Sequence, residues 1–194
     1  MTTGDRRQAG NFTFIDTPIE GLKIVETASF GDERGSFMET YKRPDFILGG
    51  IDADFVQDNQ SVSVKGVLRG LHFQIQHPQA KLVRVLEGEV YDVAVDMRKG
   101  STTFGKWEGV LLSAANRRQF FIPRGFAHGF LVLSEKAVFA YKCDDIYRPG
   151  DEGGLLYCDP DIAIEWPDLG MDYIISANDK ENPVLEGISV PEPA

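Results

Sequence analysis

Hydrophobic residues occur along the chain in short runs rich in Val, Ile, Phe and Tyr, and turn residues separate these runs. This pattern is typical of many short strands. Strands are predicted at residues 55–56, 81–86, 89–97, 107–112, 119–122, 129–133 and 137–143. Glu87-Gly88 is predicted to form a hairpin turn, and Pro44 to Gly49 is the best candidate for a short helix. The pattern predicts an all-β sandwich or barrel with little helix.

One predicted strand leaves two interpretations open. From Val90 to Asp96 the residues alternate, and one face carries Asp92 and Asp96 together with Val90 and Ala94. Such a face either lines a polar cavity or is exposed to solvent. The strand alone favours the solvated face.

Length and composition suit one domain over residues 1–194, because 194 residues with 42% hydrophobic content can bury a sizeable core. Residues 1–11 are polar and without periodicity, so we expect a flexible arm there and a short tail at 186–194. With no run of about 18 apolar residues and no secretory leader, the expected location is the cytoplasm. Cys143 and Cys158 are expected to stay reduced.

The formal net charge of −10 argues against nucleic acid as a partner, since nucleic-acid binding depends on cations that neutralise phosphates. A small phosphate ligand remains compatible with this charge because it needs only a local group of cations. The chain supplies such candidates at Arg34, Arg69, Lys81, Arg84, Arg117 and Arg118.

Two of the three histidines lie in apolar, glycine-bearing segments, which favours a functional site over simple packing. These are His72 and His128, whereas His77 lies in a sequence typical of a loop and is expected to face solvent. Pro123-x-Gly125-x-x-His128 resembles the second half of the cupin signature, which belongs to a double-stranded β-barrel fold.

The ligands of a metal-binding cupin are missing from the first half of that signature, because His72 is followed by Phe73 and Gln74 instead of a second histidine. A transition metal needs three or four ligands, so we predict no metal. A histidine near its ordinary pKa of about 6.5 can instead accept a carbon-bound proton. That reaction also needs a carboxylate, a cation and an acid, for which Asp179, Lys81 and Tyr141 are candidates.

From Phe12 to Leu185 the chain resembles the dTDP-4-dehydrorhamnose 3,5-epimerase family of cupin-fold enzymes. The resemblance rests on motifs at residues 30–35, 55–59, 67–74, 81–84, 92–96, 122–130, 141–142, 159–160 and 164–167. It implies a double-stranded β-helix fold and inversion of carbons 3 and 5 of dTDP-4-dehydro-6-deoxy-D-glucose, without metal or other cofactor. The 4-keto group acidifies both hydrogens, so each inversion is a proton removal and a return on the opposite face.

The resemblance also implies residue roles. It makes His72 the base, Asp179 its partner, Lys81 the cation at the enolate oxygen and Tyr141 the acid on the far side of the sugar. Arg69 would bind the diphosphate. The further residues implied for substrate binding are Phe30, Arg34, Glu39, Gln57, Asn59, Asp92, His128 and Glu152. The segment with Phe30, Arg34 and Glu39 would cross to the other subunit of a homodimer.

Alternatives from two classes remain at this point. The chain could invert only carbon 3, or act on a related nucleotide 4-keto-6-deoxy sugar. It could be a cupin that binds sugar nucleotides without catalysis, or a metal-dependent cupin oxygenase. Deuterium exchange at carbons 3 and 5, nucleotide-sugar binding and elemental analysis separate these alternatives.

Overall fold

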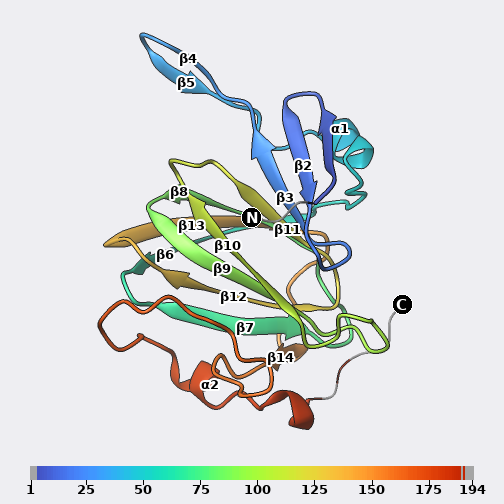
Figure 1. The fold of residues 1–194 in the computed structure, drawn as a ribbon, viewed down its shortest axis with the longest axis vertical. Helices are drawn as coiled ribbons and strands as arrows, with labels where there is room; N and C mark the ends of the chain where they lie inside the picture. The colour runs from blue at the N-terminus through green and yellow to red at the C-terminus, as the bar shows by residue number, and fades with distance from the viewer. Residues whose placement is uncertain (1–3, 189, 191–194) are drawn as a thin grey trace.

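The structure is a computed structural model that describes residues 4–188 and 190. Two antiparallel β-sheets face each other and form a barrel (Figure 1). The seven-stranded sheet has the order β1 (Arg6–Ala9), β2 (Phe12–Asp16), β3 (Lys23–Thr27), β11 (Gln119–Ile122), β8 (Lys81–Glu87), β13 (Lys136–Cys143), β6 (Gln57–Val64). The five-stranded sheet has the order β10 (Trp107–Ser113), β9 (Glu89–Asp96), β12 (Phe126–Val132), β7 (Leu68–Gln74), β14 (Glu152–Gly154). The predicted all-β cupin barrel is confirmed.

A separate hairpin of β4 (Phe30–Asp32) and β5 (Gly35–Phe37) projects from the body (Figure 1). The helical elements are α1 (Arg43–Leu48), α2 (Ala177–Lys180) and the 3-10 helix η1 (Leu185–Gly187). In the part of the chain that the structure describes, no helix is long and apolar enough to cross a membrane.

The main core fills the space between the two sheets. Phe130 of β12 and Phe139 of β13 stack across this space with ring centroids 4.2 Å apart, and the alternating apolar residues of β8, β9 and β11 surround them. Aromatic stacking adds to the burial of apolar surface, so this contact helps to hold the sheets together. Val67 and Tyr141 pack against the edge of this core, where the barrel opens into a cavity.

Helix α1 covers a second core on the outer side of the N-terminal strands. Phe46 of α1 packs edge-on against Phe12 and Phe14, with ring centroids 5.0 and 5.2 Å apart. Pro44 lies in the first turn, where a missing N–H costs no helical hydrogen bond. The helix ends before Gly49, where a Cβ atom would lie only 2.5 Å from the Phe14 ring. The helix predicted at Pro44 to Gly49 is therefore confirmed.

Part of the predicted flexible arm is a strand. Arg6–Ala9 form β1 and pair with residues 12–15, so the prediction of a flexible arm is wrong for this stretch. A strand ladder uses backbone groups, so polar side chains do not prevent it. Arg6 also forms a 2.8 Å ion pair with Glu26 of β3. Residues 1–3 and most of the predicted tail at 186–194 lie outside the described residues.

The prediction that this face of the strand at residues 90–96 is exposed to solvent is also wrong, because Asp92 and Asp96 are fully buried. Asp96 accepts hydrogen bonds from Arg98, Ser101 and Thr103 and so closes the loop after β9. Burial alone would raise the pKa of Asp96, but these hydrogen bonds outweigh burial and lower the pKa to about 2. The sequence of one strand does not reveal such partners.

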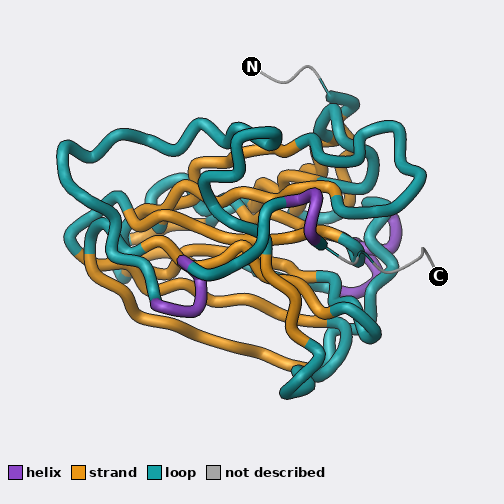
Figure 2. The backbone as a smooth tube through the Cα atoms, turned by 90° about the horizontal axis from the view of Figure 1, so that it is seen from below, coloured by secondary structure: helices purple, strands orange, loops and turns teal. Residues whose placement is uncertain are grey.

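The C-terminal segment, which includes α2 and η1, runs across the five-stranded sheet and is mostly loop (Figure 2). Asp159 fixes this segment: its carboxylate accepts hydrogen bonds from the backbone N–H groups of Asp161, Ile162 and Leu185. The segment therefore has a defined path without a strand ladder of its own. It carries residues 174–182 to the mouth of the cavity.

Candidate active site

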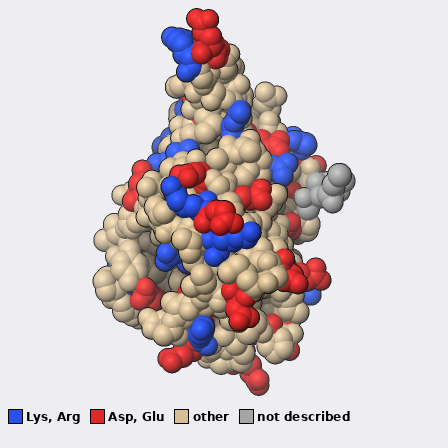
Figure 3. Space-filling view, turned by 90° about the vertical axis from the view of Figure 1, so that its left-hand side faces the viewer, with Lys and Arg blue, Asp and Glu red and all other residues tan. Residues whose placement is uncertain are grey.

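A cavity of about 770 Å³ opens between the two sheets. The molecule is visibly hollowed on this side, below the projecting hairpin (Figure 3). Seven of the residues predicted for the site line this cavity: Arg69, His72, Lys81, His128, Tyr141, Glu152 and Asp179. The structure thus brings together residues that lie up to 110 positions apart in the sequence, from Arg69 to Asp179.

His72 of β7 and Asp179 of α2 form a hydrogen-bonded pair. His72 Nε2 lies 2.6 Å from Asp179 Oδ1, while Asp179 Oδ2 accepts the backbone N–H of Gly70 at 3.2 Å. The His72 side chain is 52% exposed, whereas that of Asp179 is 8% exposed. Because the buried carboxylate holds Nε2–H, the lone pair of the imidazole lies on Nδ1. This arrangement suits a base.

Strand β7 is irregular between Arg69 and His72. Opposite β12, His72 pairs with His128 and Arg69 pairs with Phe130, so three steps on β7 match two steps on β12. This extra residue is a β-bulge, which restores both Arg69 and His72 to the cavity face although they are three positions apart. Gly70 lies within the bulge at φ 108°, where a Cβ atom would meet the His128 carbonyl oxygen at 2.6 Å.

Lys81 and Tyr141 line the same cavity from the opposite sheet. Lys81 begins β8, and Tyr141 lies on the adjacent β13. Burial lowers the pKa of Lys81, although the charges of Cys143 and Asp92 oppose this shift. Burial raises the pKa of the Tyr141 hydroxyl, so it stays protonated at neutral pH. The sheet opposite His72 therefore supplies an amine and a phenol to the cavity.

His128 and Asp92 form a second pair, deeper in the wall. His128 Nε2 lies 3.1 and 3.0 Å from the two Asp92 carboxylate oxygens. Burial raises the pKa of Asp92 and lowers that of His128, while their hydrogen bond opposes both shifts. His128 lines the cavity, whereas Asp92 is buried behind it. The predicted supporting pair is thus present as a contact.

Polar side chains form the rim of the cavity. Arg69 donates from Nε to Ser63 Oγ at 3.1 Å, which restricts its guanidinium. Glu152 accepts the hydroxyl of Tyr147 at 2.8 Å. The backbone N–H of Tyr147 donates to Gln57 Oε1 at 2.9 Å, and Gln57 Nε2 donates to Asn59 at the same distance. Gln57 and Asn59 are therefore linked to Glu152 but do not themselves line the cavity.

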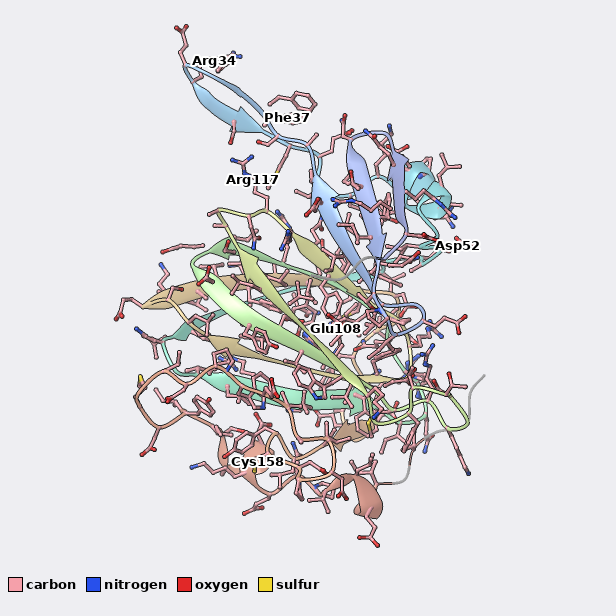
Figure 4. The ribbon with its side chains drawn as sticks, viewed as in Figure 1. Arg34, Phe37, Asp52, Glu108, Arg117 and Cys158 are labelled. Atoms are coloured by element: carbon pink, nitrogen blue, oxygen red, sulfur yellow. The ribbon has the colours of Figure 1, made fainter. Side chains whose placement is uncertain are left out.

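Three predicted residues lie away from the cavity of their own chain. Phe30 and Arg34 are on the projecting hairpin, where Arg34 pairs with Asp32. Figure 4 shows Arg34 at the tip of this hairpin. Glu39 follows the hairpin and accepts a hydrogen bond from Asn11 at 2.5 Å. The structure of a single chain does not bring these three residues to the site.

The sequence prediction missed two residues of the site. Ser176 is the N-cap of α2 and accepts the backbone N–H of Asp179 at 3.1 Å. Its spacing of three from an acidic residue is an N-cap signal that was available in the sequence. Asn182 lines the cavity beside Asp179, and no pattern in the sequence marks it.

The described residues contain no group of three or more His, Cys, Asp or Glu side chains arranged to hold a metal ion. His72 and His128 are each paired with a carboxylate instead. The absence of a metal or cofactor in the reaction remains a prediction from the sequence.

Comparisons with known proteins agree with this geometry. The family model described as dTDP-4-dehydrorhamnose 3,5-epimerase matches residues 16–187. The dTDP-4-dehydrorhamnose 3,5-epimerase of Methanothermobacter thermautotrophicus is 53% identical, over 89% of this chain and 97% of its own. That of Salmonella typhimurium is 53% identical over 89% of this chain and 94% of its own.

A solved structure shows the same similarity. It is the dTDP-6-deoxy-D-glucose-3,5-epimerase of Legionella pneumophila in complex with dTDP-4-keto-L-rhamnose, with 52% identity and a TM-score of 0.91. The match covers 94% of this chain and 99% of that one. The chain belongs to the dTDP-4-dehydrorhamnose 3,5-epimerase family.

Proposed function

We propose that this protein is an isomerase that inverts carbons 3 and 5 of dTDP-4-dehydro-6-deoxy-D-glucose and so forms dTDP-4-dehydro-L-rhamnose. The observation that carries this proposal is the placement of acid and base. His72 belongs to the five-stranded sheet and Tyr141 to the seven-stranded sheet, and both line one cavity. A sugar between them has a base on one face and an acid on the other, as inversion requires.

Each inversion takes two proton transfers. His72 removes the proton from the carbon next to the ketone, and the electron pair of the C–H bond becomes an enolate whose negative charge lies on the ketone oxygen. The ammonium of Lys81 stabilises that oxygen. Tyr141 then donates its proton to the same carbon from the opposite face, which restores the ketone with inverted configuration. Solvent returns Tyr141 and His72 to their starting protonation states.

We infer that Asp179 and Arg69 support this chemistry, Asp179 at the base and Arg69 at the diphosphate. Asp179 keeps His72 in one tautomer and stabilises the imidazolium that forms. Arg69, held by Ser63, would bind the diphosphate through its planar guanidinium. His128 and Asp92 support the wall beside them, and Glu152 with its link to Gln57 and Asn59 forms the nucleotide side of the rim.

We also propose a homodimer in which the β4–β5 hairpin completes the site of the other subunit. Phe30 and Phe37 on this hairpin are 54% and 68% exposed, although aromatic residues normally bury most of their surface. Figure 4 shows Arg34 and Phe37 clear of the body of the molecule. In the other subunit, Phe30, Arg34 and Glu39 would supply stacking and polar contacts to the nucleotide.

Incubation with dTDP-4-dehydro-6-deoxy-D-glucose in heavy water tests the reaction. Deuterium should enter at carbons 3 and 5, and the product should have the L-rhamno configuration. Deuterium at carbon 3 alone would replace the proposal with a 3-epimerase. Absence of deuterium at either carbon, with the substrate bound, would favour a binding protein and refute the proposed reaction.

A further inference from the structure

The carboxamide of Asn182 has an unusual position in the cavity wall. Asn182 lines the cavity together with His72 and Asp179. Its Nδ2 is buried and has no hydrogen-bond partner among the described residues. Native proteins pair the large majority of buried polar atoms, so an unpaired amide in a ligand cavity needs an explanation.

The sheet register places this carboxamide beside the base. Gly154 of β14 pairs directly with His72 of β7. Residues that face each other in an antiparallel ladder project from the same side of the sheet, with Cβ atoms roughly 5 Å apart. A side chain on Gly154 would therefore point into the cavity next to the His72 imidazole. Glu152, two residues earlier on β14, lines the cavity from that same side.

Asn182 occupies the space that Gly154 leaves empty. A Cβ atom on Gly154 would lie 2.0 Å from Asn182 Oδ1 and 2.3 Å from Asn182 Cγ. No L side chain fits there while Asn182 keeps its position. The carboxamide thus lies where a side chain of residue 154 would be, adjacent to His72.

The neighbouring groups leave the Asn182 donor available. Both carboxylate oxygens of Asp179 already accept hydrogen bonds, one from His72 and one from Gly70. A Cβ atom on Gly154 would lie 2.0 Å from Asn182 Oδ1 and 2.7 Å from Nδ2, so rotation about the Cβ–Cγ bond exchanges the two atoms at this position. Nδ2 breaks no hydrogen bond in this rotation. A neutral amide is suited to donate to a hydroxyl or keto oxygen, whereas the charged guanidinium of Arg69 binds a phosphate more strongly.

We propose that Asn182 is a specificity-determining residue, which donates a hydrogen bond to an oxygen of the sugar next to the carbon that His72 deprotonates. This inference rests on the proposed function, because that function places the sugar at His72. The contact belongs to binding of the sugar and not to the nucleotide. Loss of this contact should therefore weaken the binding of only those ligands that carry the sugar.

Calorimetric titration with two probes, dTDP and dTDP-glucose, isolates the sugar contact. Asn182→Ala should weaken dTDP-glucose binding three- to tenfold, which is the usual effect of one neutral hydrogen bond, and leave dTDP binding unchanged. Asn182→Asp has the same shape but no amide donor, so it should weaken dTDP-glucose binding at least as much. In turnover, Asn182→Ala should raise KM by a similar factor with little change in kcat.

Gly154→Ala provides a second, independent variant. Its methyl group displaces the Asn182 carboxamide, so it should cause the same selective loss of dTDP-glucose affinity. In an Asn182→Ala background the added methyl group should cause little further loss, because the side chain that it displaces is gone. Melting temperatures of the four proteins establish that each variant is folded.

The inference is overturned if Asn182→Ala binds dTDP-glucose as tightly as the parent protein does. It is equally overturned if the variant loses affinity for dTDP and dTDP-glucose by the same factor, or if the parent gains no affinity from the glucose. Deuterium exchange by the parent protein tests the proposed reaction separately. Absence of exchange refutes the reaction, while the two titrations still decide whether Asn182 contacts the sugar.

Discussion

The two histidine–aspartate pairs differ in exposure, and this difference separates their roles. The His72 side chain is 52% exposed to the cavity, whereas that of His128 is 7% exposed. A base must reach the substrate, and its partner must stay out of water to hold it firmly. His72 with Asp179 meets both requirements. His128, enclosed with Asp92, is suited to positioning neighbouring groups.

Substitution of Tyr141 should separate proton removal from inversion. Tyr141→Phe removes the acid on the seven-stranded sheet but leaves His72 and Asp179 intact. His72 can then remove a proton and return deuterium to the same face, so we expect exchange in heavy water with little inversion. His72→Asn should abolish both. Mass spectrometry and NMR of the recovered sugar measure the two outcomes, and full inversion by Tyr141→Phe would contradict the role of Tyr141.

The shifted pKa of Lys81 predicts how activity falls at high pH. A lysine is charged below its pKa, and burial lowers the pKa of Lys81, so its charge is lost at a lower pH than in an exposed lysine. The pKa of Tyr141 is raised, so Tyr141 ionises later. We therefore expect kcat to fall on the alkaline side as Lys81 loses its proton.

A pair of variants assigns this alkaline fall. Lys81→Arg keeps a positive charge at all accessible pH, so any activity that it retains should persist to higher pH. Lys81→Met should lower kcat at every pH, because the enolate oxygen loses its cation. If the alkaline midpoint of kcat stays unchanged in Lys81→Arg, the fall belongs to another group and not to Lys81.

At the scale of the elements, alternation along the chain predicted the strands with one buried face, and β8 to β11 and β13 lie within a residue or two of their predicted positions. Strand β6 was missed, because the strand predicted at residues 55–56 ends just before it begins. Its sequence, Gln57 to Val64, carries polar residues on both faces, and it forms by pairing along its whole length with β13. Such a strand depends on its partner and has little signal of its own.

The loop after β9 depends on one buried carboxylate. Asp96 accepts hydrogen bonds from Arg98, Ser101 and Thr103, so its removal leaves several donors unpaired. We expect Asp96→Ala to lower the free energy of unfolding by about 3 kcal/mol. Asp96→Asn keeps the shape and one acceptor oxygen, so its loss should be smaller. Urea denaturation measures both.

The pKa of Asp96 also gives the sign of its acid dependence. The pKa is lowered to about 2 in the folded protein, so the carboxylate binds fewer protons there than in the unfolded chain. Its stabilising contribution is complete above the unfolded pKa of about 4 and is lost as pH falls toward 2. This part of the acid dependence should vanish in Asp96→Asn. An unchanged dependence would assign it to other carboxylates.

At the scale of the whole molecule, the sequence named candidate residues that share one cavity, but it did not predict their contacts. His72, Lys81 and Tyr141 were identified by type and motif, and the fold brings them to one cavity. The burial of Asp92 could not be read from its own strand, because it depends on His128 of the neighbouring β12. Asn182 has no signal at all, since its position depends on the missing side chain of Gly154.

The proposed exchange of hairpins between subunits predicts complementation between two inactive proteins. One variant carries His72→Asn, and the other carries Phe30→Ala with Arg34→Ala on the hairpin. In a mixed dimer, the subunit with an intact His72 receives an intact hairpin from its partner, so one of its two sites is complete. The other site lacks both. The same subunits in separate homodimers have no complete site.

Co-expression of the two variants with different affinity tags, and purification through both tags, yields the mixed dimer. Random assembly gives about one complete site in four, because about half of the dimers are mixed and each has one complete site. The purified mixed dimer should therefore regain about half of the parent activity per dimer. If each hairpin instead completed the site of its own chain, neither site of the mixed dimer would be complete. The site of the His72→Asn subunit would lack the base, and the site of the other subunit would lack an intact hairpin. Activity would then not exceed that of the separate variants. The measured rate thus decides which subunit the hairpin completes.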